Sequence, residues 1–421
     1  MTWFACILVF LLVSLPSSAQ RASLAVTSQH PLPNSALQVL IPAAAPSSAT
    51  VPLIFEDNRV FVELSFRRPD GSFRKARAWV DTGGGWFAIT ERVANDIGAQ
   101  RKGAPFESDE QQAVDIASPA VYLADLPLDL SSARAAAILG SDRVSPGVDA
   151  EAFLPARVLM HYQAVFDYAA KKFTLARPGT LQPQGQAVSS PIQKETGFPR
   201  IDIEIGGKPY GFLLDTGAAY TTVSGDLLDQ LANDHPSWPR LTGAVGEANM
   251  VGTSDANALM LRLAQIRWGP FEIRNAGAVS RRPGTFETYM SKLMTGPIVG
   301  ALAGNVLRHF RVQIDYPSGI TYLKQVSQPN PSGLDSLGIV FRAAADGSYF
   351  VAGVAPKDDE CLQRSVRVGD LIVEVDGLKA TGATRATLIQ ALRGKPGDKH
   401  KLIVERGGKQ FESQCVVRHL L

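Results

Sequence analysis

Short segments of alternating apolar and polar residues recur along the chain, and they come in two similar sets. In the segment IDIEI, residues 201–205, isoleucine occupies every second position, which predicts a strand with one buried face. A Gly-Gly pair then predicts a hairpin turn, and the apolar run GFLL that follows ends at Asp-Thr-Gly. Residues 59–83 show the same order, from RVFVELSF to ARAWVDTG. Each set therefore begins with a predicted strand pair that delivers one aspartate into a glycine turn.

The two sets continue alike, which identifies them as a diverged internal repeat. After Asp-Thr-Gly each has a short predicted helix, TERVANDIG or SGDLLDQLA. Later each has an apolar-apolar-Gly segment, ILG at 138–140 or IVG at 298–300. Each set ends with a predicted hairpin, YQAVFDYAAKKFTLA or FRVQIDYPSGITYL. The repeat predicts two β-rich lobes with one topology.

Stretches rich in Pro, Gly and small polar residues mark predicted linkers between the blocks. They place a flexible leader at 20–53, a first lobe at 54–178, a second lobe at 190–325 and a third domain at 332–420. Residues 1–19 contain an apolar run followed by small residues, which predicts a secretory signal peptide. An uncleaved anchor is the alternative, but the run is shorter than the about 20 residues that span a bilayer. We expect an exported protein, periplasmic or secreted, without an integral membrane span after cleavage.

Composition and charge exclude several functional classes. The chain has 42 basic and 40 acidic residues and a net charge of +2, so no basic footprint indicates a nucleic-acid partner. The three cysteines and six histidines form no motif with metal-ligand spacing, and we expect no metal ion and no organic cofactor. Cys361 and Cys415 remain after signal cleavage, and the sequence leaves open whether they form a disulfide.

The order of strand, Asp-Thr-Gly, helix, apolar-apolar-Gly and closing hairpin resembles the lobes of pepsins and retroviral aspartic proteases. The resemblance covers most of residues 54–325 and implies a mainly β, bilobal acid-protease fold with one catalytic aspartate from each lobe. It implies that the threonines lock the two loops together, that the glycines let the backbone turn, and that ILG and IVG support the loops. The residues so assigned are Asp81, Thr82 and Gly83 with Gly140 in the first lobe, and Asp215, Thr216 and Gly217 with Gly300 in the second.

The chemistry of paired carboxylates agrees with this assignment. Two carboxylates about 3 Å apart cannot both ionise, so they share a proton and titrate separately. The ionised member can accept a proton from water while the protonated member donates one to a substrate carbonyl. An isolated aspartate at a turn more often caps its own backbone. Two aspartates in matching loops favour the catalytic interpretation.

The residues after the two Asp-Thr-Gly motifs depart from the pepsin pattern. Pepsin-like loops usually carry Ser or Thr there, whereas this chain has Gly84 and Ala218. These residues have no hydroxyl to donate to the carboxylates, and the loss of donors to the charged form raises carboxyl pKa values. We therefore predict an activity optimum closer to neutral pH than that of pepsin-like enzymes.

A glycine-rich segment, RLTGAVGEANMVGTSD, follows the second catalytic motif and is similar to the flap that closes over substrate in this family. We expect Gly243, Gly246 and Gly252 to be its flexible points, and an ordinary surface hairpin is the alternative. The corresponding part of the first block has no such glycines, so the sequence predicts a flap on the second lobe alone.

The third domain resembles a bacterial PDZ domain along its whole length. The segments that carry the resemblance are Leu337-Gly338-Ile339, VRVGDLIVEVDG and ATLIQALRGKPGD. It implies that the amides of residues 337–339 bind a peptide C-terminal carboxylate and that the peptide adds as an extended strand beside residues 339–341. The alternative is a domain that packs on the lobes and binds nothing.

Taken together, these patterns predict an exported, monomeric aspartic endopeptidase whose partners are polypeptide substrates and peptides at the PDZ groove. A monomer is expected because both halves of the site lie in one chain. A catalytically inactive peptide-binding scaffold is the main alternative. In a third possibility each lobe pairs with its copy in another chain.

Overall fold

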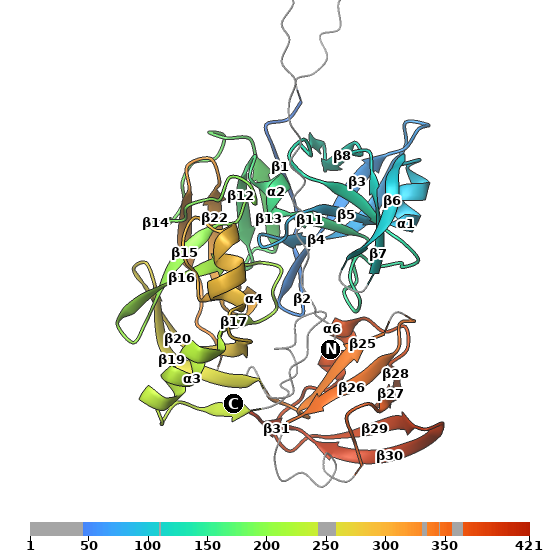
Figure 1. Ribbon diagram of the computed structural model, residues 1–421, viewed down its shortest axis with the longest axis vertical. Helices are drawn as coiled ribbons and strands as arrows, with labels where there is room; N and C mark the ends of the chain where they lie inside the picture. Colours follow the sequence, from blue (N-terminus) through green and yellow to red (C-terminus); the bar gives the residue numbers. More distant parts are fainter. Residues whose placement is uncertain (1–44, 109–110, 243–257, 331–334, 345, 356–364) are drawn as a thin grey trace, which may run out of the picture. The chain divides into compact units, whose positions relative to one another are not determined.

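The computed structural model describes residues 45–421 except for 109–110, 243–257, 331–334, 345 and 356–364 (Figure 1). Strands dominate these residues, and helices are few and short. The predicted mainly β, bilobal fold is therefore confirmed. No helix in the described part of the chain is long and apolar enough to cross a membrane.

The first lobe is built on one large sheet with the strand order β6-β7-β10-β5-β11-β4-β3-β8-β9, and β2 pairs with β3 outside that path. Two short helices, α1 (Glu91–Asp96) and α2 (Ala156–Leu159), follow β5 and β11. The strands are β2 (Ile54–Glu56), β3 (Arg59–Arg67), β4 (Phe73–Asp81), β5 (Phe87–Thr90), β6 (Arg101–Ser108), β7 (Gln111–Ile116), β8 (Val121–Leu123), β9 (Leu126–Pro127), β10 (Ala135–Ile138) and β11 (Ala152–Pro155).

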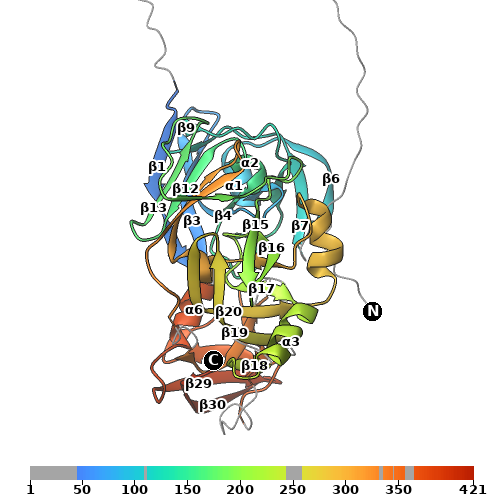
Figure 2. The same ribbon diagram turned by 90° about the vertical axis from the view of Figure 1, so that its left-hand side faces the viewer.

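The second lobe repeats this plan in a sheet with the order β15-β16-β21-β17-β20-β19-β18. Its longest strands, β19 and β20, form an antiparallel pair, and β17 runs parallel to β20 (Figure 2). The strands are β15 (Arg200–Ile205), β16 (Lys208–Leu214), β17 (Thr221–Ser224), β18 (Arg240–Thr242), β19 (Leu259–Trp268), β20 (Phe271–Arg281) and β21 (Gly300–Leu302). The helices are α3 (Gly225–Asp234), a π-helical turn (Thr285–Tyr289), a 3₁₀ turn (Met290–Leu293) and α4 (Gly304–Leu307).

A third sheet joins the two lobes, because the predicted closing hairpins pair with each other. Its order is β1-β13-β12-β22-β23-β14, and β12 pairs antiparallel with β22 from the other lobe. The strands are β1 (Ser48–Pro52), β12 (Gln163–Asp167), β13 (Lys172–Ala176), β14 (Gln186–Ser189), β22 (Phe310–Asp315) and β23 (Ile320–Gln325). Two of them lie outside the predicted lobes: β1 lies in the expected leader and β14 in the expected linker. Both are ordered because their backbones complete the edges of this sheet.

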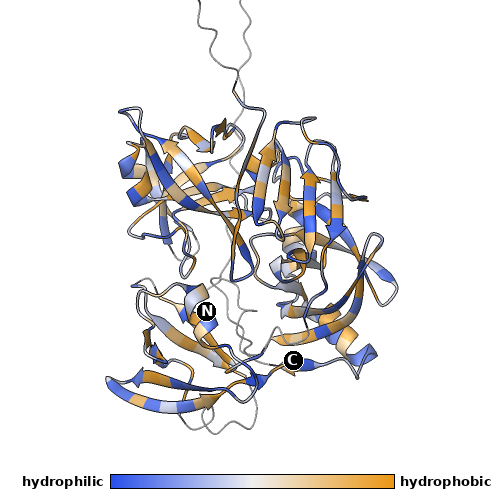
Figure 3. Ribbon diagram, turned by 180° about the vertical axis from the view of Figure 1, so that it is seen from behind, coloured by the Kyte–Doolittle hydropathy of each residue, from blue (hydrophilic) through white to orange (hydrophobic). Residues whose placement is uncertain are grey.

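The alternation of apolar and polar residues gives the core (Figure 3). The three isoleucines of IDIEI in β15 are buried, and Asp202 between them is exposed. One apolar cluster runs through both lobes and includes residues of β3, β4, β15 and β16. This continuous core holds the two central strands that end at the aspartates.

The described residues from 335 onward include a separate sheet, β25-β26-β27-β29-β30, with its own apolar core, and a two-stranded sheet of β24 and β31. Helix α6 (Arg385–Ala391) begins at Thr384, whose side chain accepts a hydrogen bond from the Thr387 amide. Cys415 is buried and disulfide-bonded, whereas Cys361 lies outside the described residues. The strands are β24 (Asp335–Ser336), β25 (Ile339–Ala343), β26 (Tyr349–Val354), β27 (Leu371–Val375), β28 (Leu378–Lys379), β29 (Lys399–Arg406), β30 (Lys409–Val416) and β31 (Arg418–His419).

Candidate active site

The two Asp-Thr-Gly loops leave corresponding strands of the two lobes. β4 runs parallel to β11, which runs antiparallel to β5. In the second lobe β16 runs parallel to β21, which runs antiparallel to β17. Asp81 is the last residue of β4, and Asp215 directly follows β16. Equivalent strand ends therefore carry the two aspartates.

The two threonines bind the loops to each other through reciprocal hydrogen bonds. The Thr82 amide donates to Oγ1 of Thr216 at 3.2 Å, and the Thr216 amide donates to Oγ1 of Thr82 at 3.0 Å. Each hydroxyl then donates to a carbonyl of the opposite strand, Leu214 at 2.5 Å and Val80 at 3.0 Å. Both threonines are buried, so this network fixes one loop against the other.

The glycines of the loops leave room for the opposite carboxylate. A Cβ added to Gly217 would lie 2.1 Å from Cγ of Asp81, and one added to Gly83 would lie 3.1 Å from Cγ of Asp215. Neither glycine has a positive φ, so both are needed for space and not for conformation. The structure thus brings together all six residues predicted for the two loops, with each aspartate packed on the other loop.

The two carboxylates accept different numbers of backbone hydrogen bonds. Oδ1 of Asp215 accepts from the amides of Gly217 at 2.9 Å and Ala218 at 2.8 Å. Oδ1 of Asp81 accepts from Gly83 at 2.6 Å, while the Gly84 amide donates to the Asp81 carbonyl instead. Donors favour the ionised form, so this asymmetry favours a charged Asp215.

Burial is the main cause that raises the pKa of both carboxyl groups above the ordinary aspartate value. The charge of Asp215 and its hydrogen bond with Asp81 raise the pKa of Asp81 further, well above its usual range. The Ala218 and Gly217 amides and the bond from Asp81 hold the pKa of Asp215 lower. These causes, like the backbone hydrogen bonds, favour a proton on Asp81 and a charge on Asp215.

The structure explains why residue 84 is glycine, which the sequence alone did not reveal. A Cβ at this position would lie 2.4 Å from Cζ of Phe153, whose ring packs edge-on against Trp79 at 5.0 Å. By strand register, Phe153 in β11 corresponds to Ala301 in β21, and Gly84 corresponds to Ala218. The first lobe thus combines a large residue with glycine, where the second lobe combines two alanines.

We expect Gly84→Ala to lower the free energy of unfolding by about 1–3 kcal/mol, because the methyl group overpacks against Phe153. Urea unfolding would measure this change. Adding Phe153→Leu should recover part of the loss, so the two changes together should cost less than the sum of their separate costs. Strictly additive costs would contradict the proposed steric contact.

The prediction that Gly140 supports the first catalytic loop is wrong. Gly140 follows β10, which pairs with β5, and its amide donates to Glu91. The strand beside β4 is β11, so Ala152 stands where Gly300 stands in the second lobe. Gly300 itself needs to be glycine, since a Cβ there would lie 2.5 Å from the Thr222 carbonyl oxygen.

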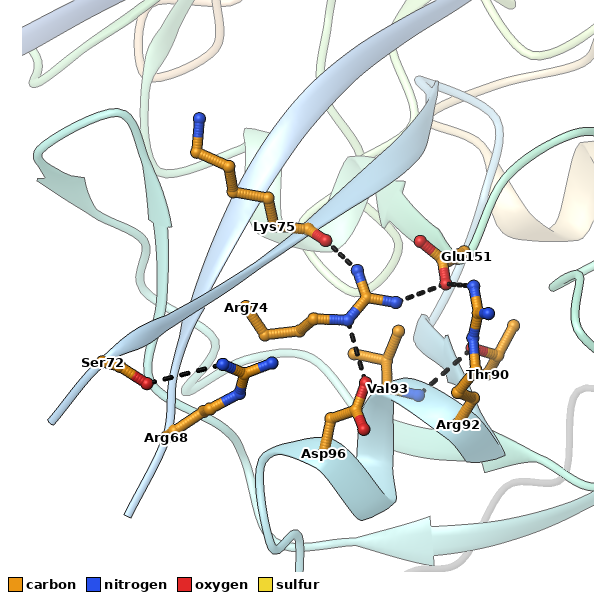
Figure 4. Close-up of polar contacts among 9 residues, drawn as sticks. All are labelled: Arg68, Ser72, Arg74, Lys75, Thr90, Arg92, Val93, Asp96 and Glu151. Atoms are coloured by element: carbon orange, nitrogen blue, oxygen red, sulfur yellow. Dashed lines mark hydrogen bonds and ion pairs between the residues drawn. The ribbon is translucent and has the colours of Figure 1, made fainter. Parts of the chain in front are cut away.

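A charged residue, Glu151, stands directly before β11 where the apolar-apolar-Gly segment of the second lobe has an apolar residue. It occupies the position of Val299, and its carboxylate accepts hydrogen bonds from Arg74 and Arg92, each at 2.5 Å (Figure 4). Arg74 also binds Asp96 of α1 at 2.9 Å. This polar network fixes the start of β11 against β4 and α1, at the position where the second lobe has the apolar Val299.

The predicted flap glycines, Gly243, Gly246 and Gly252, lie outside the described residues. They belong to the segment that connects β18 with β19, and these two strands pair at the edge of their sheet. In the first lobe β6 and β7 form an antiparallel hairpin at the same edge position. The flap on the second lobe stays a prediction, and the first lobe has a hairpin at the same edge position although it lacks the glycines.

The residues predicted to bind a peptide carboxylate lie directly before and at the start of β25. The Leu337 amide donates to the Leu392 carbonyl at 3.0 Å, and the Gly338 amide donates to Oγ of Ser336 at 3.1 Å. A carboxylate at this place would have to replace the Ser336 hydroxyl. In the described sheet, β25 pairs only with β26, so its other edge faces away from the sheet.

Comparison with known proteins finds a family match within the second lobe. Residues 201–288 match the family described as aspartyl protease. The fold is similar to the crystal structure of an aspartic proteinase from Irpex lacteus, with 13% identity and a TM-score of 0.41 over 67% of this chain and 98% of that one. The chain is also 26% identical over 96 residues, 23% of its length, to FERM and PDZ domain-containing protein 2 of Mus musculus. That alignment spans 7% of the mouse protein.

Proposed function

We propose that the protein is an exported aspartic endopeptidase that hydrolyses polypeptides with a water activated by Asp81 and Asp215. The observation that carries this proposal is a pair of carboxylates that accept different numbers of backbone hydrogen bonds on two mutually locked loops. Buried carboxyl groups with pKa values pushed apart are the arrangement that acid–base catalysis needs. The expected signal peptide supports export.

In this reaction Asp215 acts as the general base and Asp81 as the general acid. Asp215 accepts a proton from the attacking water and Asp81 donates its proton to the scissile carbonyl oxygen, which gives a tetrahedral diol. Asp215 then gives its proton to the leaving nitrogen as the C–N bond breaks, and Asp81 takes a proton from a diol hydroxyl, which restores the pair. The Gly217 and Ala218 amides stabilise the charged Asp215 before the reaction, so little reorganisation is required. The hydrogen bonds of Thr82 and Thr216 hold the two loops, and so the two carboxylates, in place during the reaction.

We expect cleavage to follow a bell-shaped pH profile with both limbs above about pH 4, the ordinary carboxylate value. Activity should rise as Asp215 ionises and fall as Asp81 loses its proton, and burial raises the pKa of both groups. Cleavage of a mixed peptide library by residues 20–421 between pH 3 and 8 would measure this profile. An optimum below about pH 4 would contradict it, and no cleavage at any pH would favour the inactive scaffold.

We further propose that residues 332–420 form a PDZ domain that recruits or presents polypeptide. The open edge of β25 and the neighbouring helix α6 support this, since a peptide can add there as a strand. Offering the same peptide library with free and with amidated C termini tests the proposal. A preference for free carboxylates supports the groove, and equal binding of both sets would argue for strand addition without carboxylate capture.

A further inference from the structure

Arg59 is a buried cation close to the catalytic pair. Its side chain is 2% exposed, and its Nε donates to the Gly217 carbonyl oxygen at 3.1 Å. Its charge lowers the pKa of both catalytic aspartates. A buried arginine is costly unless its hydrogen bonds are made, and the bond to the Gly217 carbonyl offsets part of that cost.

The contact with Gly217 reaches Asp215 through a single peptide group. The Gly217 carbonyl and the Ala218 amide belong to the same peptide unit, and that amide donates to Oδ1 of Asp215 at 2.8 Å. A cation on the carbonyl oxygen polarises the unit and strengthens its N–H as a donor. Arg59 therefore favours the ionised form of Asp215 without touching its carboxylate.

This contact breaks the symmetry of the two lobes. Arg59 precedes Val60, which pairs with Val80 next to the first loop. In the second lobe Phe198 precedes Pro199, whose carbonyl accepts from the amide of Leu214. Phe198 thus occupies the position of Arg59 and has no charge to offer the first loop. The positive charge of Arg59 therefore contacts the loop of Asp215, which favours Asp215 over Asp81 as the base.

Asp57 binds Arg59 to the C-terminal domain. Its Oδ2 accepts hydrogen bonds from Arg59 and from Nε of Arg385, the latter at 3.0 Å, and all three side chains are at most 8% exposed. Arg385 begins α6, and its NH1 group donates to the Phe341 carbonyl of β25 at 3.4 Å. The same arginine thus contacts the open strand edge and the partner of Arg59.

The turn that carries Asp57 is held tightly in place. Asp57 and Asn58 have φ values of 47° and 54°, which identify a tight hairpin between β2 and β3. A Cβ added to Gly304 would lie 1.7 Å from the Asn58 carbonyl oxygen, so α4 of the second lobe packs directly on the turn. The backbone of the turn is therefore held in place, and the Asp57 carboxylate links Arg59 to Arg385.

We propose that Arg59 is the positioning residue of the second catalytic loop, and that the C-terminal domain sets its position through the Asp57–Arg385 ion pair. This inference rests on the proposed protease function. A peptide that pairs with β25 competes for the Phe341 carbonyl and moves Arg385, so groove occupancy changes the support of Asp215. The charged groups around Arg59 are Asp57, Arg385 and the two catalytic aspartates.

The test measures the pKa values of the catalytic pair in residues 20–421 by ¹³C NMR of labelled aspartate, together with kcat and KM for peptide cleavage. Arg59→Met should raise the pKa of the ionising carboxyl by about 1 unit, since a nearby positive charge is lost. Arg59→Lys keeps the charge but loses the directed Nε bond, so kcat should fall at least about tenfold with a smaller pKa change. Arg385→Gln should shift the pKa in the same direction as Arg59→Met.

Lys401→Gln is the matched control, because Lys401 forms an exposed ion pair with Glu412 within the C-terminal domain. It should leave the pKa values and kcat unchanged. Combining Arg385→Gln with Arg59→Met should add nothing to Arg59→Met alone, since both act through one path. Thermal unfolding confirms that each variant folds, and Arg385→Gln still tests the path if the Arg59 variants do not fold.

Unchanged pKa values in Arg59→Met and Arg385→Gln, with lower thermal stability alone, would show a purely structural role and overturn the proposal. Failure of the protease function is a separate result: the parent then cleaves no peptide. The NMR titration does not depend on turnover, so it decides the role of Arg59 in either case.

Discussion

Asp215→Asn is expected to lower kcat/KM for peptide cleavage by about 10²–10⁴-fold, the range that general acid–base catalysis contributes. Asparagine keeps the shape of the side chain and can still accept from the Gly217 and Ala218 amides, but it cannot take a proton from water. Steady-state kinetics at the pH optimum would measure the loss. Activity within about tenfold of the parent would show that other groups perform the cleavage.

Asp81→Asn provides the matched control for folding. Because the pKa of Asp81 is raised in the folded state, the folded protein binds this proton more tightly than the unfolded chain. Stability is then lost as pH rises from about 3.9, the unfolded value, through the folded pKa. Asparagine does not titrate, so the variant should be inactive yet lose less stability between pH 4 and 7 in urea unfolding. Loss of folding at both pH values would leave its inactivity uninformative, and Asp215→Asn would then decide.

Gly217→Ala is expected to lower kcat/KM by about 10²-fold, because its Cβ would lie 2.1 Å from Cγ of Asp81 and must displace that carboxyl group. Gly83→Ala is the matched variant in the other loop. Its Cβ would meet Asp215 at 3.1 Å, so a shift of a few tenths of an ångström accommodates it and the loss should be smaller.

The comparison of these two alanine variants tests the geometry of the pair and not only its chemistry. Neither glycine has a positive φ, so backbone strain does not contribute to either effect. Equal losses in both variants would contradict the asymmetric packing of the two aspartates. A loss in Gly217→Ala that comes with unfolding, checked by circular dichroism, would assign the effect to stability instead.

Much of the fold and the centre of the site follow from local sequence pattern. Strand alternation and the Asp-Thr-Gly motifs are short-range signals, and they predicted the two lobes and the paired loops. The remaining features depend on contacts between distant residues. Arg59 lies 158 positions from the Gly217 carbonyl it binds, and nothing in the segment DNRVF indicates that contact.

The error at Gly140 has a similar cause. The segment ILG matches IVG in residue type, but strand order assigns the supporting role to β11, where Phe153 replaces a small residue and Glu151 has its own arginine partners. Gly84 compensates for Phe153 across the loop. This pair of changes keeps the packing of the loop, although β11 lacks the apolar-apolar-Gly sequence. A search for that sequence therefore finds ILG at 138–140 instead of β11.

The sheet that joins the two lobes makes the order of synthesis matter. Gln163 in β12 pairs with Asp315 in β22, 152 positions later, and β23 completes that hairpin only at Gln325. Contacts at such separation form late in folding. A chain still emerging from the ribosome therefore holds both aspartates before the sheet that joins their lobes is complete. The two Asp-Thr-Gly loops can be joined through this sheet only after the chain has been made as far as β23.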